Sequence, residues 1–134
     1  MYSQQIKEIT MIYQVYQIKL TKEEIALINS TGNHAVVPAN DLKQKMVFAK
    51  GRLGGYAAEA WDSGYYTHVA NITAEDYDQV FEIGNIGPEQ NIERIAQMYS
   101  VSVGDMIIAE DGTQVVVDSF GFVAIGHKPE LVAA

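Results

Sequence analysis

The chain has 134 residues, of which 48% are hydrophobic, with no cysteine and a formal net charge of −8. This length is enough for one domain with its own hydrophobic core, and the lack of cysteine excludes disulfides and thiolate metal sites. No stretch reaches the roughly 18 apolar residues of a membrane span, and the first residues lack the pattern of a secretion signal. We therefore expect one soluble, cytoplasmic domain over residues 1–134, with residues 1–10 as a loose N-terminal arm.

Charge is distributed unevenly along the chain. Lys43, Lys45, Lys50 and Arg52 fall within ten residues. Residues 53–126 contain one basic residue, Arg94, against twelve acidic ones: Glu59, Asp62, Glu75, Asp76, Asp78, Glu82, Glu89, Glu93, Asp105, Glu110, Asp111 and Asp118. Such a surface repels a phosphate backbone, so we expect no direct nucleic-acid binding. The basic segment would attract only something small or locally acidic.

Residues 11–20 predict the first strand. In a strand, Ile12 and Ile18 lie on one face and Gln17 lies on the other. This alternation predicts one buried face, with the isoleucines, and one solvated face. The chain as a whole is only 19% charged, below the roughly 25% of an average soluble domain. We therefore expect part of its apolar surface to be covered in a homodimer, with residues 12–20 as an exposed edge strand at the seam.

Helix starts and loops are indicated further along the chain. Thr21 and Glu24 fit a capping box, in which the two side chains satisfy free amides at a helix start. Asn40 and Asp41 predict the start of a second helix. Residues 51–55 are rich in glycine but lack the lysine and hydroxyl ending of a phosphate-binding loop, so we expect a flexible connection there.

The next part predicts a strand, a helix and another strand. Residues 65–72 have the composition of a strand. Thr73 and Asp76 predict the start of a short helix that ends near Gly84. Residues 95–98 are then expected to lead, as a strand, into the C-terminal region.

The clearest signal is a β-meander at the C-terminal end. Residues 106–109 and 114–118 are rich in β-branched side chains, and the Asp-Gly pair at 111–112 predicts a tight hairpin between them. A third run follows at 120–125. The elements together predict an α+β fold, with a mostly antiparallel sheet of five or six strands and two or three short helices on one face.

No motif for catalysis is present. The three histidines have no partner at metal-ligand spacing, and the serines lack the frame of a nucleophile elbow. Asp105 and Asp118 lie where the chain enters or leaves a strand, and two close carboxylates can bind a cation or exchange protons. Aspartate beside glycine or serine more often accepts hydrogen bonds from its own turn amides. The candidate binding residues are Ser100, Ser102, Asp105, Asp118, Ser119, and the aromatic pair Trp61 and Tyr65, which also fits the core.

Three blocks of the sequence resemble a known family. Residues 13–18 (Tyr-Gln-Val-Tyr-Gln-Ile), 100–105 and 117–122 resemble the YodL-like domain of mobile-element proteins. With the segment Asn-Ile-Gly-Pro-Glu at 85–89, the chain is also similar to short proteins of bacteriophages, including those that infect cyanobacteria. The resemblance implies a phage or mobile-element origin, and hence the cytoplasm of a host cell, and it brings no catalytic residue with it.

These observations favour a non-catalytic accessory protein that binds a host protein or a small ligand. We expect no catalytic residue, no metal, no cofactor and no membrane partner. Two alternatives stay open. One is an acidic nucleic-acid mimic that blocks a DNA-binding protein, and the other is a small enzyme or cation site built on Asp105 and Asp118.

Overall fold

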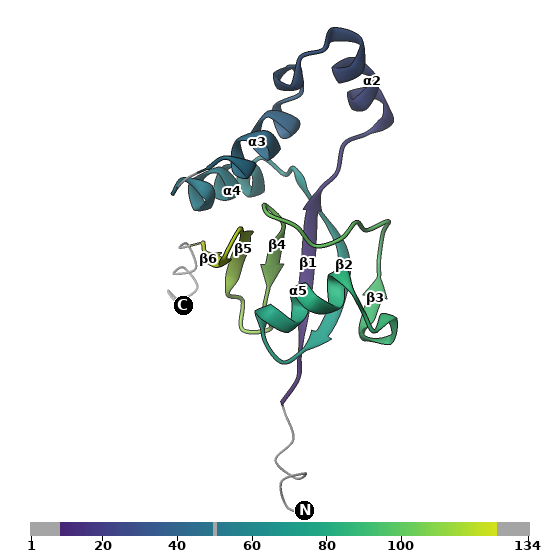
Figure 1. The fold of residues 1–134 in the computed structure, drawn as a ribbon, viewed down its shortest axis with the longest axis vertical. Helices are drawn as coiled ribbons and strands as arrows, with labels where there is room; N and C mark the ends of the chain where they lie inside the picture. Colours follow the sequence, from purple (N-terminus) through teal and green to yellow (C-terminus); the bar gives the residue numbers. More distant parts are fainter. Residues whose placement is uncertain (1–8, 50, 126–134) are drawn as a thin grey trace, which may run out of the picture.

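The computed structural model describes residues 9–49 and 51–125, and most of the expected N-terminal arm, residues 1–8, lies outside this range. The fold is α+β, as predicted from the sequence. Its described part has one six-stranded sheet in the order β3-β2-β1-β4-β5-β6 and four α-helices, against the two or three expected (Figure 1). The strands are β1 (Met11–Ile18), β2 (Tyr66–Ala74), β3 (Ile92–Arg94), β4 (Met106–Ile108), β5 (Gln114–Asp118) and β6 (Gly121–Ala124).

The first strand lies in the middle of the sheet. β1 pairs with β2 along its whole length and with β4 at residues 14–16, and every pairing in the sheet is antiparallel. A strand that is bonded on both sides has no free row of amides and carbonyls to offer a second chain. The expected dimer seam along residues 12–20 is therefore wrong. The strand expected at residues 95–98 is also wrong, because β3 ends at Arg94.

The predicted C-terminal meander is confirmed. In the hairpin between β4 and β5, the Ala109 amide donates to the Thr113 carbonyl (2.9 Å) and the Gly112 amide donates to the Ala109 carbonyl (2.9 Å). Gly112 has φ +89°, a conformation that side chains with a Cβ seldom adopt. A three-residue hairpin loop that ends on such a glycine is one of the common hairpin connections.

Helices pack against both faces of the sheet, because the two faces belong to two separate core clusters that each include helical residues. The helices are α2 (Lys22–Thr31), α3 (Pro38–Val47), α4 (Leu53–Asp62) and α5 (Tyr77–Asn85), with short 3-10 helices η1 (His34–Val36) and η2 (Glu89–Asn91). Val80 and Ile83 of α5 join one core cluster, whereas Leu42 of α3 and Ala57 of α4 join the other. The expectation of helices on one face is therefore wrong. Within the described ranges no helix is both long enough and apolar enough to cross a lipid bilayer.

The capping box of α2 is confirmed. The Thr21 hydroxyl accepts from the Glu24 amide (3.0 Å), and the Glu24 carboxylate accepts from the Thr21 amide (2.8 Å). For α5 the predicted capping residue was wrong. The side chain that caps this helix is Asp76, which accepts from the Gln79 amide (2.8 Å). Thr73 instead lies in β2.

The segment between α2 and β2 departs most from the sequence-based expectations. α3 begins at Pro38, because proline suits the first turn of a helix, where its missing N–H is not needed. Asn40 lies inside the helix, and its side-chain amide donates to the His34 carbonyl (3.1 Å), which joins α3 to η1. The expected flexible connection at 51–55 is wrong from Leu53 onward, because α4 begins there and includes two of the glycines.

Candidate functional site

A buried glutamine of the central strand organises the candidate site. Gln17 is 3% exposed, although the alternation of residues along the strand predicts that it lies on the solvated face. Its Nε2 donates to the Tyr99 carbonyl (2.8 Å) and to Asp105 Oδ2 (3.0 Å), and its Oε1 accepts from the Tyr99 amide (3.0 Å). Because β1 is covered on both faces, a polar side chain at this position needs partners inside the protein. We call Gln17, Tyr99, Ser102 and Asp105 the Gln17 junction.

Asp105 is the buried carboxyl of this junction. It is 9% exposed, and its Oδ2 also accepts from the Ser102 amide (2.9 Å), while the Ser102 hydroxyl donates to the Ser100 carbonyl (3.0 Å). Burial raises the pKa of Asp105 to about 7, although the hydrogen bonds from Ser102 and Gln17 and the charge of Lys43 act in the opposite direction. Desolvation therefore dominates, and it favours the neutral carboxyl.

The structure does not bring the carboxylates of Asp105 and Asp118 together. The Asp105 carbonyl accepts from the Val117 amide (2.9 Å), and Asp118, the next residue of β5, projects to the opposite face because side chains alternate along a strand. Asp118 accepts from the Ser119 amide (2.7 Å). Elsewhere in the described ranges, too, no three His, Asp or Glu side chains gather closely enough to hold a metal ion.

The candidate aromatic residues lie on the other side of the sheet, between α4 and β2. The Trp61 ring meets the Tyr16 ring edge-on at 5.0 Å and lies 6.0 Å from the Tyr66 ring. Tyr65 is half-buried against the same core cluster. Both candidates therefore contribute to packing around the start of β2, away from the Gln17 junction.

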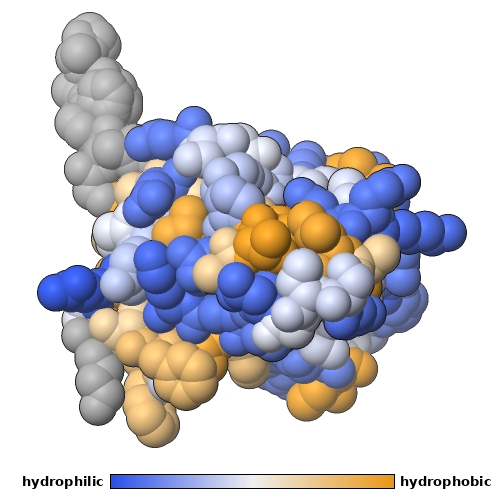
Figure 2. Space-filling view, turned by 90° about the horizontal axis from the view of Figure 1, so that it is seen from above, coloured by the Kyte–Doolittle hydropathy of each residue, from blue (hydrophilic) through white to orange (hydrophobic). Residues whose placement is uncertain are grey.

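A groove lies beside the junction, at the end of the molecule that carries α2. Its volume is about 240 Å³, and its lining residues are Ile18, Lys19, Leu20, Ile25, Lys43 and Tyr99. We call it the Lys43 groove. Figure 2 looks onto this end of the molecule and shows hydrophobic surface bordered by hydrophilic residues. Exposed Ile25 and Leu27 on α2 contribute apolar surface here.

Two contacts fix the polar part of the groove. Lys43 Nζ, from α3, donates to the Ile18 carbonyl at the end of β1 (3.3 Å). Gln17 binds the backbone of Tyr99 through both its amide atoms, so the Tyr99 side chain, 59% exposed, is held at the groove. Gln17 thus connects the buried Asp105 with the groove wall.

The sequence alone did not indicate Gln17, Tyr99 or the role of Lys43. One signal was present: Gln17 is a polar residue between Tyr16 and Ile18. In a central strand such a residue needs hydrogen-bond partners inside the protein. The basic run that contains Lys43 was noted for its charge, but its neighbours in the fold, Ile18 and Tyr99, are remote in the chain. Only the packing of α3 on the sheet brings them together.

Comparison with known proteins finds no matching family model, no matching curated protein and no matching solved structure. The chemistry of the groove and the junction is therefore the basis for a functional conclusion.

Proposed function

We propose that this protein is a non-catalytic binding protein that holds a small amphipathic carboxylate in the Lys43 groove. The observation that carries the proposal is the combination of two lysines, Lys19 and Lys43, with the apolar residues Ile18, Leu20 and Ile25 in one lining. Small-molecule sites typically combine a mostly apolar lining with a few polar groups that orient the ligand. An apolar chain with one carboxylate matches both parts of this lining.

The charge of the groove supports an anionic ligand. The chain has a net charge of −8, yet the groove is lined by two lysines and no carboxylate. An ammonium group has three N–H donors, and within the described residues Lys43 uses one of them on the Ile18 carbonyl. The remaining donors can form charge-assisted hydrogen bonds, which are stronger than neutral ones.

The same lining supports binding without catalysis. It contains no histidine, serine, threonine or carboxylate, so the side chains that most often transfer protons or attack a substrate are missing from it. Asp105 does not line the groove, and its Oδ2 accepts hydrogen bonds from Gln17 and Ser102. These bonds give Asp105 a role in holding the Tyr99 loop.

Titration with octanoate, followed by two-dimensional NMR, tests the proposal. We expect shifts of the resonances of Ile18, Leu20, Ile25 and Tyr99 that saturate with octanoate, and much weaker shifts with octanol, which has the same chain without the charge. Binding should weaken as salt is added, because the ammonium groups are partly exposed to solvent.

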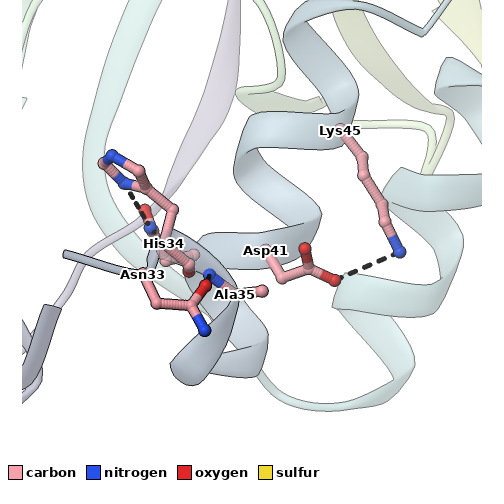
Figure 3. Close-up of polar contacts among 6 residues, drawn as sticks. Asn33, His34, Ala35, Asp41 and Lys45 are labelled. Carbon is pink, nitrogen blue, oxygen red and sulfur yellow. Dashed lines mark hydrogen bonds and ion pairs between the residues drawn. The ribbon is translucent and has the colours of Figure 1, made fainter. Parts of the chain in front are cut away.

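A pair of lysine substitutions on α3 provides the matched control. Lys43→Met keeps the length of the side chain and removes its charge, and we expect octanoate affinity to fall at least about tenfold. Lys45→Met makes the same chemical change two residues away, where Lys45 pairs with Asp41 (3.1 Å; Figure 3), and should leave the affinity unchanged. Equal binding of octanoate and octanol, or equal effects of the two substitutions, would contradict the proposal.

We propose further that this binding activity serves an accessory role in a phage or similar mobile element. An accessory protein acts by holding a ligand or a partner, so it needs no reaction of its own. This fits the groove, where Lys43 and Lys19 are suited to hold an anion.

A further inference from the structure

The two edges of the sheet differ in how they are protected. β3 has three residues, two of which are charged, and Arg94 donates two hydrogen bonds to the Glu89 carboxylate (2.6 and 3.0 Å). β6 forms the other edge, and residues 119–125 contain neither a charge nor a proline. Natural sheets use charged side chains and prolines to keep edge strands from pairing with other chains. β3 is guarded in this way, and β6 is not.

The free side of β6 carries hydrogen-bonding groups that can be assigned from its register. The Ile125 amide donates to the Gln114 carbonyl of β5 (2.9 Å). In an antiparallel pair the direction of these groups alternates from residue to residue, so Val123 also faces β5. The N–H and C=O groups of Phe122 and Ala124 therefore face away from β5, where the described residues place no further strand.

We propose that β6 pairs in antiparallel orientation with β6 of a second copy of this chain, across a two-fold axis at Val123. The sheets of the two copies then form one continuous sheet. In this register Phe122 lies beside Ala124 of the second copy, and the two-fold axis repeats the pair in the other direction. A large side chain thus meets a small one twice, and Val123 meets its own copy, a β-branched pair of the kind that stabilises sheets.

The surface around β6 also favours a second copy of the chain. Phe120, at the turn before β6, is 97% exposed, and Phe48, at the end of α3, is 78% exposed. Two copies, each with a net charge of −8, repel one another over most of their surface, whereas residues 119–125 carry no charge. Because salt screens that repulsion, the dimer should become tighter as salt is added, the opposite of octanoate binding.

Two substitutions at the exposed Ala124 test the pairing. Ala124→Pro removes the outward N–H and leaves the bonds to β5 intact, as proline is tolerated where an edge strand faces solvent. Ala124→Lys adds a charge to the edge. Since a two-fold axis repeats each change, we expect either variant to raise the dimer dissociation constant at least about tenfold. Ala26→Lys, at an exposed position of α2, makes the same chemical change away from the edge and should have no effect.

Light scattering over a concentration series measures the association, and circular dichroism checks that each variant is folded. We expect the unmodified chain to approach twice its 14.8 kDa mass. Hydrogen exchange gives a second readout without substitutions, because the Phe122 and Ala124 amides should be protected in the dimer and exposed on dilution. A chain that stays at 14.8 kDa at its highest soluble concentration, or a dimer that survives both Ala124 substitutions, would overturn the proposal. Either result leaves the octanoate experiment unaffected.

Discussion

The C-terminal meander and the Gln17 junction meet at β4, but they are held together by different means. In the meander each strand pairs with the next one in the sequence, and the hairpin between β4 and β5 closes over three residues that end at Gly112. In the junction Gln17 bonds to Tyr99 and Asp105, which lie 82 and 88 positions away in the chain. The meander therefore depends on local turn chemistry, and the junction depends on buried polar groups that find partners only in the finished fold.

This comparison predicts that changes in the junction cost more stability than changes in the meander. An unpaired buried polar group loses its full hydration without compensation. A turn residue in a poor conformation costs only its backbone strain. Three experiments sharpen the contrast, in order of decreasing effect.

The largest effect is expected from the ionisation of Asp105. Burial raises the pKa of Asp105 to about 7, whereas an aspartate in an unfolded chain has a pKa of about 3.9. The folded state therefore binds this proton more tightly than the unfolded state, and the contribution of Asp105 to the free energy of unfolding falls as pH rises from about 4 to about 7. Linkage puts the loss on the order of 4 kcal/mol.

Asp105→Asn provides the reference for this experiment. Asparagine keeps the shape of the neutral carboxyl and does not ionise, so the stability difference between the two proteins isolates Asp105 from the other carboxylates. Denaturant unfolding from pH 4 to pH 8 should show the unmodified protein losing stability relative to Asp105→Asn as pH rises. A difference that is constant over this range would show that Asp105 ionises as readily in the fold as in the unfolded chain.

A smaller loss is expected from Gln17→Leu. The change keeps the approximate size of the side chain but removes the Gln17 partner of the Tyr99 amide, the Tyr99 carbonyl and one acceptor position of Asp105. We expect a cost of about 3 kcal/mol. Gln14→Leu, on the same strand, is the control, because Gln14 accepts one part-buried bond from Tyr16 and its loss should cost about 1 kcal/mol. Urea unfolding measures both, and equal losses would mean that the junction is no more sensitive than the rest of β1.

The smallest effect is expected in the meander, from Gly112→Val. A Cβ at Gly112 would meet no atom within 4 Å, but φ there is +89°, so the cost is backbone strain of about 1 kcal/mol. Gly112→Asn should cost less, since asparagine tolerates positive φ better than a β-branched residue. Thermal unfolding compares the two variants. If valine and asparagine lower the melting temperature equally, backbone conformation is not the cause.

How far the sequence predicted each region follows from the distance between its interacting residues. The Thr21 capping box and the Asp111-Gly112 hairpin were predicted because their partners lie within four residues. The start of α3 was misplaced, because Asn40 resembles a cap, yet its amide bonds to the His34 carbonyl within the fold. The glycines after residue 50 likewise predicted a loop, but α4 forms there and packs on the sheet through Ala57 and Ala60.

The amino-acid sequence by itself determined the fold class, the meander and the charge imbalance, since strand periodicity, turn residues and composition are local or additive properties. The tertiary structure decided which strand is central and which is an edge. That order buried Gln17, raised the pKa of Asp105 and placed Lys43 beside Ile18 and Tyr99. Within the described residues it also placed β6, rather than β1, at an edge of the sheet. The physical reason is that burial and hydrogen-bond partners are set by the order of strands and the packing of helices, which join residues far apart in the chain.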